Sequence, residues 1–218
     1  KRLPSILPDM TPEESLESSA IWSVAGLLDR ENPLLTRRPF RSPHHTISNA
    51  GLAGGGTNPK PGEISMAHQG VLFLDELPEF SRTAMECLRQ PLEDGRVTIS
   101  RVSASLAYPC TMMLVAAMNP CPCGRGEVEL GCRCKPEEKR RYLRKISGPL
   151  MDRIDIHIEV VPVSISEINS TERAESSAEI RRRVVAAREI QSRRFAGTSI
   201  HSNAMMNSAM LRTACLLR

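Results

Sequence analysis

The run GVLFLDE at residues 70–76 constrains the fold of this chain more than any other stretch. Four apolar residues in a row, 71–74, are typical of a strand buried on both faces, as in a parallel sheet. Pro78 follows closely, so the chain must leave the strand directly after the two acids. Ligands bind at the carboxyl ends of strands in open α/β sheets. Asp75 and Glu76 are therefore candidates for a Mg²⁺-bound phosphate and an activated water.

A simpler interpretation fits the same acids equally well: Asp75 caps a turn and Glu76 is solvated. A second apolar run, residues 112–117, favours the site, because it closes with Asn119 and Pro120. If the two strands are neighbours, the Asn119 amide lies beside the acids and can reach a terminal phosphate or the attacking water. Taken alone, Asn119 is better explained as part of an Asn-Pro turn.

Apolar periodicity places helices and strands alternately along the chain. A capping box at Thr11 with Pro12 in the first turn predicts the first helix. The expected helices are residues 12–30, 81–90, 135–146, 174–195 and 203–217, and the expected buried strands are 71–75, 112–117 and 154–161. Val97, Ile99 and Val102 alternate with polar residues, which predicts exposed strand pairing in a hairpin with residues to Leu106. This alternation predicts an α/β fold with a mostly parallel sheet covered by helices on both faces.

Composition sets looser limits on class and compartment. The 218 residues suffice for one large domain or for one domain with a small second one. The net charge of +4 is too mild to indicate nucleic-acid binding by itself. No apolar run approaches the roughly 18 residues that span a bilayer, so no membrane partner is expected. Seven cysteines, four of them clustered, fit a reducing compartment, and we expect a cytoplasmic protein.

Four cysteines form the pairs Cys121/Cys123 and Cys132/Cys134. Four thiolates are one way to hold a structural Zn²⁺. The C-x-C spacing is less usual than C-x₂-C, and a reduced thiol cluster on a loop is the competing interpretation. Cys87 and Cys110 fit core or near-core positions.

Arg153 stands just before the third predicted strand. Its fixed charge and planar fork suit phosphate oxygens, and an arginine from a neighbouring chain can stabilise a phosphoryl-transfer transition state. Taken alone, it is better explained as a surface residue paired with Asp152 or Asp155. His44 and His45 lie in a proline-bounded loop, where a structural or pore-facing role is favoured.

Several long motifs closely resemble the magnesium-chelatase-like AAA+ ATPases of the ComM/YifB type. They are RPFRSPHHT at 38–46, GGG at 54–56, PGEIS at 61–65, GVLFLDELPEF at 70–80, LRQPLEDG at 88–95, NPCPCG at 119–124 and SGPLMDRID at 147–155. The resemblance covers nearly the whole chain. It implies an AAA+ three-layer αβα core with a mostly parallel sheet, followed by the start of a helical lid.

The resemblance also implies roles for single residues. Asp75 and Glu76 match the Walker B pair, with Asp75 holding Mg²⁺ through water and Glu76 activating water. Asn119 matches sensor 1, and Arg153 matches the arginine finger that acts across a ring interface.

The same resemblance implies a domain plan. The core is expected at 1–164, with insertions at about 39–62 and 96–109 and a cysteine-rich loop at 121–134. Such insertions commonly face the pore of the ring. A linker and partial lid are expected at 165–218.

No stretch matches the phosphate-binding pattern G-x-x-x-x-G-K-[ST]. We expect this Walker A loop upstream of residue 1 and the sensor 2 arginine beyond residue 218. On this interpretation the chain is an internal segment of a longer motor, and by itself it binds ATP weakly or not at all and is inactive.

The resemblance implies an ATP- and Mg²⁺-dependent ring motor, a hexamer in the intact protein, that remodels DNA by branch migration. One alternative is a chelatase subunit that drives metal insertion into a porphyrin. An alternative of another class is a non-catalytic zinc-bearing interaction domain.

Overall fold

The computed structural model describes residues 2–29, 31–56, 59–100, 105–126, 131–161, 163, 174–198, 200 and 202–214. The chain divides into two compact units. The larger is Asp9–Pro162, and the smaller combines Lys1–Pro8 with Val163–Arg218. The candidate site residues all belong to the larger unit.

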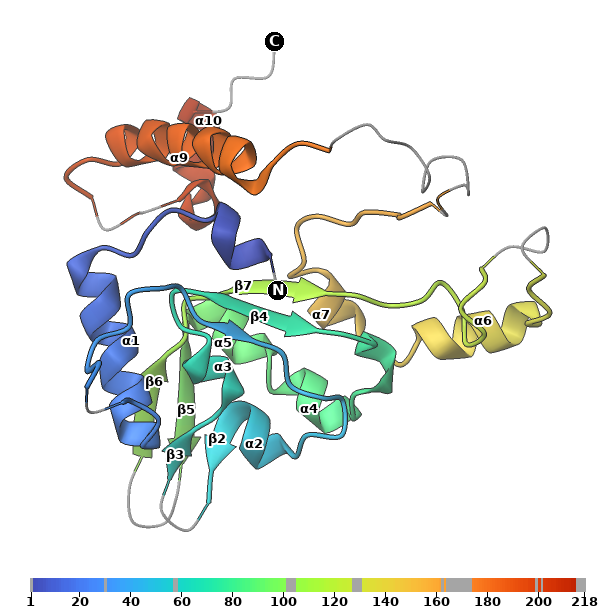
Figure 1. Ribbon diagram of the computed structural model, residues 1–218. Helices are drawn as coiled ribbons and strands as arrows, with labels where there is room; N and C mark the ends of the chain where they lie inside the picture. Colours follow the sequence, from blue (N-terminus) through green and yellow to red (C-terminus); the bar gives the residue numbers. More distant parts are fainter. Residues whose placement is uncertain are drawn as a thin grey trace. The chain divides into compact units, whose positions relative to one another are not determined.

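The larger unit alternates short strands and helices (Figure 1). Its elements in chain order are α1 (Pro12–Ala25), β1 (Phe40–Arg41), α2 (Asn49–Ala53), β2 (Gly54–Gly55), β3 (Lys60–Pro61), α3 (Glu63–Met66), β4 (Val71–Leu74), the 3₁₀ turn η2 (Leu77–Glu79), α4 (Arg82–Glu86), α5 (Arg89–Asp94), β5 (Arg96–Ser100), β6 (Ser105–Pro109), β7 (Met113–Ala116), α6 (Pro136–Leu143) and α7 (Gly148–Met151).

A parallel sheet of order β1-β4-β7 forms the centre of this unit, as predicted. The register pairs Phe40 with Val71 on one side of β4 and Leu74 with Ala116 on the other. Glycine at position 70 lets the chain at Pro39 approach closely, because a Cβ atom on residue 70 would lie 2.1 Å from the Pro39 carbonyl oxygen. The Val71 N–H donates a hydrogen bond to the same Pro39 carbonyl oxygen at 2.8 Å. Strand β4 thus has a hydrogen-bonded neighbour on each side. Its apolar sequence follows from burial on both faces, because Val71 on one face and Leu72 and Leu74 on the other are fully buried.

One face of the sheet packs against helices to form the main core. Leu72 and Leu74 of β4 are fully buried there. The residues buried with them are Leu52, Ile64, Ala67, Leu77, Phe80, Ala84, Met85, Leu88, Val97, Ile99, Cys110, Ile146 and Leu150. These side chains are mostly aliphatic, so the core rests on branched and straight side chains rather than on aromatic rings.

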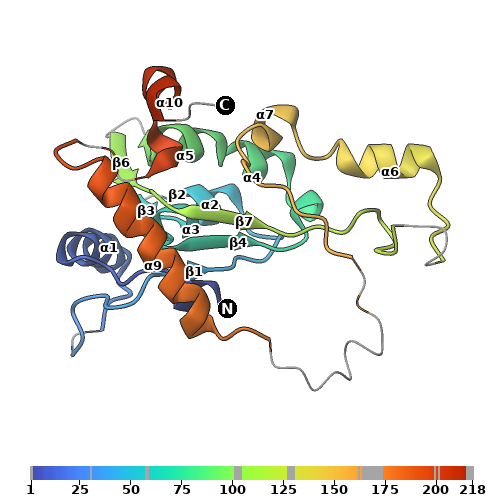
Figure 2. The same cartoon turned by 90° about the horizontal axis from the view of Figure 1, so that it is seen from above.

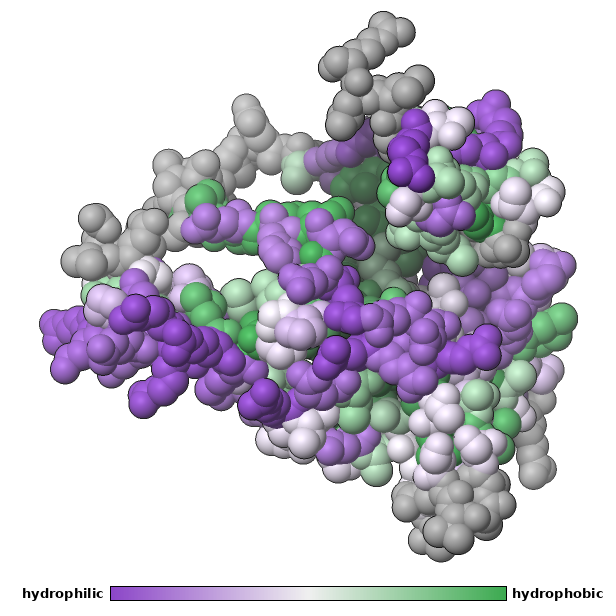
Figure 3. Space-filling model, turned by 180° about the vertical axis from the view of Figure 1, so that it is seen from behind, coloured by the Kyte–Doolittle hydropathy of each residue, from purple (hydrophilic) through white to green (hydrophobic). Residues whose placement is uncertain are grey.

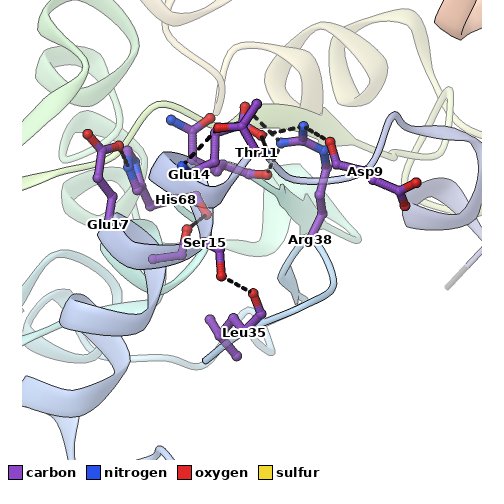
Figure 4. Close-up of polar contacts among 10 residues, drawn as sticks. Asp9, Thr11, Glu14, Ser15, Glu17, Leu35, Arg38 and His68 are labelled. Atoms are coloured by element: carbon purple, nitrogen blue, oxygen red, sulfur yellow. Dashed lines mark hydrogen bonds and ion pairs between the residues drawn. The ribbon is translucent and has the colours of Figure 1, made fainter. Parts of the chain in front are cut away.

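Polar contacts attach α1 to the rest of the unit (Figure 4). The predicted capping box is present: the Glu14 N–H donates to Thr11 Oγ1 at 3.2 Å, and the Thr11 N–H donates to Glu14 Oε2 at 2.9 Å. The helix ends at Ala25, earlier than residue 30, because Gly26 takes the left-handed conformation (φ 74°) and closes it. Arg38 ties this helix to the strand region, since its guanidinium donates to the Glu14 carboxylate at 2.8 Å and to the Gln69 carbonyl at 2.8 Å.

The two segments expected as insertions are packed on each other. Antiparallel strands β5 and β6 form the predicted hairpin, with Val97 and Ile99 turned into the core. The tip, residues 101–104, lies outside the described residues. Strands β2 and β3 form a second ribbon, and the Tyr108 hydroxyl of β6 donates to the Pro59 carbonyl beside it at 3.3 Å. Both ribbons lie on the same side of the unit in Figure 1.

The strand predicted at 154–161 is wrong for this structure. These residues are not assigned to a strand, and Ile156, Ile158 and Val160 are 74%, 79% and 85% exposed. Apolar residues do alternate along this segment, but a strand also requires a neighbour that takes its backbone hydrogen bonds. Within the described part of the chain the sheet ends at β7 and β1, and neither pairs with this segment.

The smaller unit is helical where it is described. It contains η1 (Leu3–Ile6), α9 (Ser177–Arg194), η3 (Asn203–Met205) and α10 (Ser208–Ala214), and α9 lies against η1. The helix predicted at 174–195 is confirmed, with Ser176 and Glu179 forming its capping box. The helix predicted at 203–217 is shorter, a 3₁₀ turn followed by α10, and residues 215–217 lie outside the described part.

Among the described residues, no helix combines the length and the apolar character needed to cross a bilayer.

Candidate active site

The acidic pair lies where β4 ends. The Asp75 carboxylate accepts the Glu76 N–H at 3.0 Å, and both side chains are exposed. Glu76 adopts the left-handed conformation with φ 53°, which is uncommon for a residue with a side chain. Such backbone strain, of order 1 kcal/mol or more, clusters at functional sites. The turn into η2, with Pro78 in its first positions, sends the chain away at once and leaves both carboxylates at the sheet edge.

The loop carrying Asn119 leaves the neighbouring strand at the same edge. The Ala117 N–H donates to the Leu74 carbonyl at 2.9 Å, and the Leu77 N–H donates to the Ala117 carbonyl at 3.0 Å. Hydrogen bonds therefore bracket the acidic pair and hold it beside the chain that leads to Asn119. The structure brings these three predicted residues to one end of the sheet, beyond which α6 lies in both views (Figures 1 and 2).

Tyr142 of α6 joins these residues, and sequence reasoning missed it. The residue is buried, with 6% of its surface exposed. Burial raises the pKa of Tyr142, and the nearby charges of Glu79, Cys121 and Glu76 raise it further. A hydrogen bond with the Asn119 backbone acts in the opposite direction. The tyrosine thus lies among the acids, Asn119 and the cysteine loop. No local pattern marks it, because its partners come from three separate segments.

His45 contacts the acidic pair directly. Its Nδ1 lies 3.2 Å from Glu76 Oε2, and its ring packs edge-on against Phe80 with centroids 6.4 Å apart. The neighbouring His44 ring lies 4.1 Å from it. The sequence alone favours a structural or pore-facing role for His45 and does not predict this contact. The signal that could have found this contact is topological, because His45 follows β1, and parallel strands β1 and β4 end at the same edge.

Arg153 occupies a different place, just after α7. Its guanidinium forms an ion pair with Glu93 of α5 and donates to the Pro149 carbonyl, and its side chain is 21% exposed. These contacts hold Arg153 against α5 and the start of α7, and none of them is with Asp75 or Glu76.

The four clustered cysteines meet in space. Their sulfur atoms all lie within 4.8 Å of one another. Cys121 and Cys132 are buried, Cys134 is half-buried and Cys123 is exposed. Burial acts to raise the pKa of the Cys121 thiol, but hydrogen bonds from the Gly126 N–H and the neighbouring cysteines outweigh it and lower that pKa to about 6. Cys110 is different: burial raises its pKa to about 12, as expected for an inert core thiol.

With this geometry established, similarity to known proteins decides the family. The model of magnesium chelatase, subunit ChlI, matches residues 1–168, and the model of its C-terminal region matches residues 174–218. This chain belongs to the magnesium-chelatase family.

The chain is also similar to relatives of the ComM and YifB type and, over a shorter stretch, to a magnesium-chelatase subunit. It is 46% identical over 218 residues to the competence protein ComM of Haemophilus influenzae, covering 99% of this chain and 42% of that protein. It is 44% identical over 217 residues to YifB of Escherichia coli, covering 99% and 42%. A 67 kDa magnesium-chelatase subunit of Chlorobaculum parvum is 30% identical over 115 residues, which are 53% of this chain and 15% of that subunit. The chain thus spans less than half the length of these relatives.

Proposed function

We propose that this chain is the core of an ATP-hydrolysing AAA+ ring motor. The observation that carries the proposal is the shared edge of β4 and β7, where Asp75, Glu76 and the Asn119 loop emerge together. Carboxylates at such an edge suit Mg²⁺, which keeps several waters and is bound through one or two acids plus phosphates. When bound, Mg²⁺ neutralises charge on the phosphates.

The protein residues would divide the remaining work. Asp75 would hold Mg²⁺ through water, because its carboxylate lies at the end of the strand. Glu76 would accept a proton from the attacking water or orient it. The Asn119 amide would donate to a terminal phosphate oxygen. His45, in contact with Glu76 Oε2, would fix the direction of that carboxylate.

Arg153 would act on a neighbouring subunit's nucleotide as an arginine finger. The ion pair with Glu93 would hold the Arg153 side chain in one orientation. Its side chain is 21% exposed, so a nucleotide bound to a neighbouring subunit could contact the guanidinium. A homo-oligomeric ring, of six subunits in the intact protein, is part of the same proposal.

DNA is the client that we favour, in the branch-migration role of a ComM-type motor, which would place the protein in the cytoplasm. Arg141, Arg144 and Lys145, on and just after α6, line with Arg82 an open pocket of about 340 Å³ beside η2. Figure 3 shows hydrophilic side chains gathered over this helix. Basic groups on a concave surface suit a phosphate backbone. The similarity to the competence protein ComM supports the same choice.

Two alternatives remain distinguishable by experiment. A chelatase subunit would use the same motor on a porphyrin complex, which the match to the Chlorobaculum subunit supports. ATPase activity of the intact protein stimulated by branched DNA supports the first choice, and stimulation by a porphyrin-binding partner supports the second. A zinc-bearing interaction domain would show no ATPase activity at all.

The test of the motor is Glu76→Gln in the intact protein. This variant keeps the size of the side chain but removes the base, so we expect a loss of kcat by about 10²–10⁴-fold with ATP binding retained. Glu31→Gln, in an exposed loop, is the matched control and should keep wild-type activity. Unchanged turnover in Glu76→Gln would refute the assignment.

A further inference from the structure

The loop between β7 and α6 brings four sulfur atoms into one group. The Sγ–Sγ distances are 3.3 Å for Cys121–Cys123 and 3.7 Å for both Cys121–Cys132 and Cys123–Cys132. Cys134 completes the set within 4.8 Å of every other sulfur. Four ligands at the usual Zn–S length of about 2.3 Å in a tetrahedron are separated by about 3.8 Å. Two of these separations equal that edge to about 0.1 Å, the third is shorter by about 0.5 Å, and those to Cys134 are at most 4.8 Å.

The same distances disfavour disulfide bonds. A disulfide needs sulfurs about 2.05 Å apart, and the shortest separation among Cys121, Cys123 and Cys132 is 3.3 Å. Here three sulfurs are nearly equidistant and all four cysteines are free. A group that meets at one point rather than in pairs is the arrangement of a shared ion.

The backbone around the sulfurs is shaped to support thiolates. The Gly126 N–H donates to Cys121 Sγ at 3.3 Å, and the Gly124 N–H closes a turn on the Cys121 carbonyl at 3.0 Å. Gly124 has φ 80°, so the turn after the first cysteine pair uses the left-handed conformation that glycine adopts without strain. Hydrogen bonds to ligand atoms of this kind orient and stabilise metal-bound sulfur.

Charge near the cluster has the sign that a zinc–thiolate centre needs. Zinc with four thiolates carries a net charge of −2. The cysteine pairs are flanked by Arg125, Arg133 and Lys135, and Lys139 of α6 reaches back to donate to the Gly126 carbonyl. These cations lie on the segment that would carry the negative charge.

We propose that Cys121, Cys123, Cys132 and Cys134 bind one structural Zn²⁺ ion. The loop has few apolar residues to form a core, so the ion takes that place and fixes the exit of β7 to the start of α6. Cys121 follows Asn119 by two residues, and the ion therefore also anchors the loop beside the candidate active site. Zinc binding by these cysteines does not depend on ATP binding or hydrolysis. A measurement of bound zinc therefore does not test the ATPase assignment.

The test measures metal in protein purified under reducing conditions without chelator. We expect one zinc per chain by elemental analysis, and after replacement by Co²⁺ the intense visible bands of tetrahedral cobalt thiolate. Cys123→Ser is the informative variant, because its side chain is exposed and the packing should survive. In a chelator competition, this variant should bind zinc more than about 100-fold more weakly than wild type. Loss of a hydrogen bond to a metal ligand typically costs about 10–100-fold, so a larger loss indicates that Cys123 itself binds the metal.

Cys87→Ser is the matched control, a half-buried free cysteine outside the cluster, and should keep the full metal content. Circular dichroism of each variant separates metal loss from unfolding. Zinc far below one equivalent in wild-type protein, iron in its place, or equal metal loss in both variants would overturn the proposal. So would mass spectrometry that finds the four cysteines joined as disulfides in the native, reduced preparation.

Discussion

His68 should make the stability of this protein fall between about pH 7 and pH 5. Its side chain is 3% exposed and bridges α1 to the chain entering β7. The Thr111 N–H donates to Nδ1 at 3.1 Å, so the imidazole proton lies on Nε2, which faces Glu17 Oε2 at 3.1 Å. A second proton would have to occupy Nδ1, directly opposite the Thr111 N–H. The folded structure therefore has no acceptor for it.

The sign of the pH effect follows from this geometry. Burial lowers the pKa of His68 below its ordinary value of 6.5, and the nearby Glu17 opposes the shift only in part. Between the two pKa values the unfolded chain binds a proton that the folded chain does not. Stability is thus complete above pH 6.5 and is lost as the pH falls, by at most about 1.4 kcal/mol per pH unit. At pH 5 the loss is bounded at about 2 kcal/mol.

Two substitutions separate the hydrogen bond from the charge. His68→Leu leaves the Thr111 N–H without an acceptor, which costs about 1–3 kcal/mol at neutral pH. Loss of the Glu17 contact adds little, because that carboxylate is 57% exposed. His68→Asn can place an amide oxygen where Nδ1 lies, and should lose about half as much. Neither variant titrates at this position.

The assay is urea unfolding followed by Trp22 fluorescence at several pH values. Trp22 is the single tryptophan, and its Nε1 donates to the Met66 carbonyl at 3.1 Å, close to His68 in the chain. The advantage of wild type over His68→Leu should shrink by up to about 2 kcal/mol between pH 7.5 and pH 5. Carboxylates away from this position have the same surroundings in all three proteins, so their contributions cancel. Parallel stability curves for wild type and both variants would refute the reasoning.

Three further predictions use the same larger unit. Leu74→Ala removes a fully buried side chain of β4 and should cost about 2–5 kcal/mol in urea unfolding, whereas Leu106→Ala, at 39% exposure, should cost less than about 1 kcal/mol. Equal losses would contradict the assigned core. Arg38→Lys breaks the fork on Glu14 and should cost about 1–3 kcal/mol, while the exposed neighbour in Arg37→Lys should stay within about 0.5 kcal/mol. Arg153→Ala in the intact protein should lower ATPase turnover by about 10³-fold without changing ATP affinity, and a mixed ring of this variant with Glu76→Gln subunits should regain activity at some interfaces. Absence of any recovery would argue against a finger acting in trans.

The sequence alone was sufficient to predict helices and strands whose stabilising residues all lie within the element itself or directly beside it. The strand at 71–74 is recognisable because four apolar residues end in two acids and a proline, and the first helix because Thr11, Pro12 and Glu14 form a capping box. The hairpin and the parallel pairing of β4 with β7 followed from alternation and from buried runs. These signals are local, so neighbouring residues carry them completely.

Tertiary structure decided what depends on partners distant in the chain. Apolar alternation at 154–161 predicted a strand, yet no described segment pairs with it, and only pairing makes a strand. His45 reaches Glu76 because two parallel strands end at one edge, and Tyr142 of α6 lies within hydrogen-bonding reach of the Asn119 backbone in a different segment. The cysteine spacing left open a thiol cluster or a metal site, and only the folded loop showed four sulfurs meeting at one point. The sequence gives the number of residues between two cysteines, whereas the distance between their sulfur atoms is set by how the loop folds.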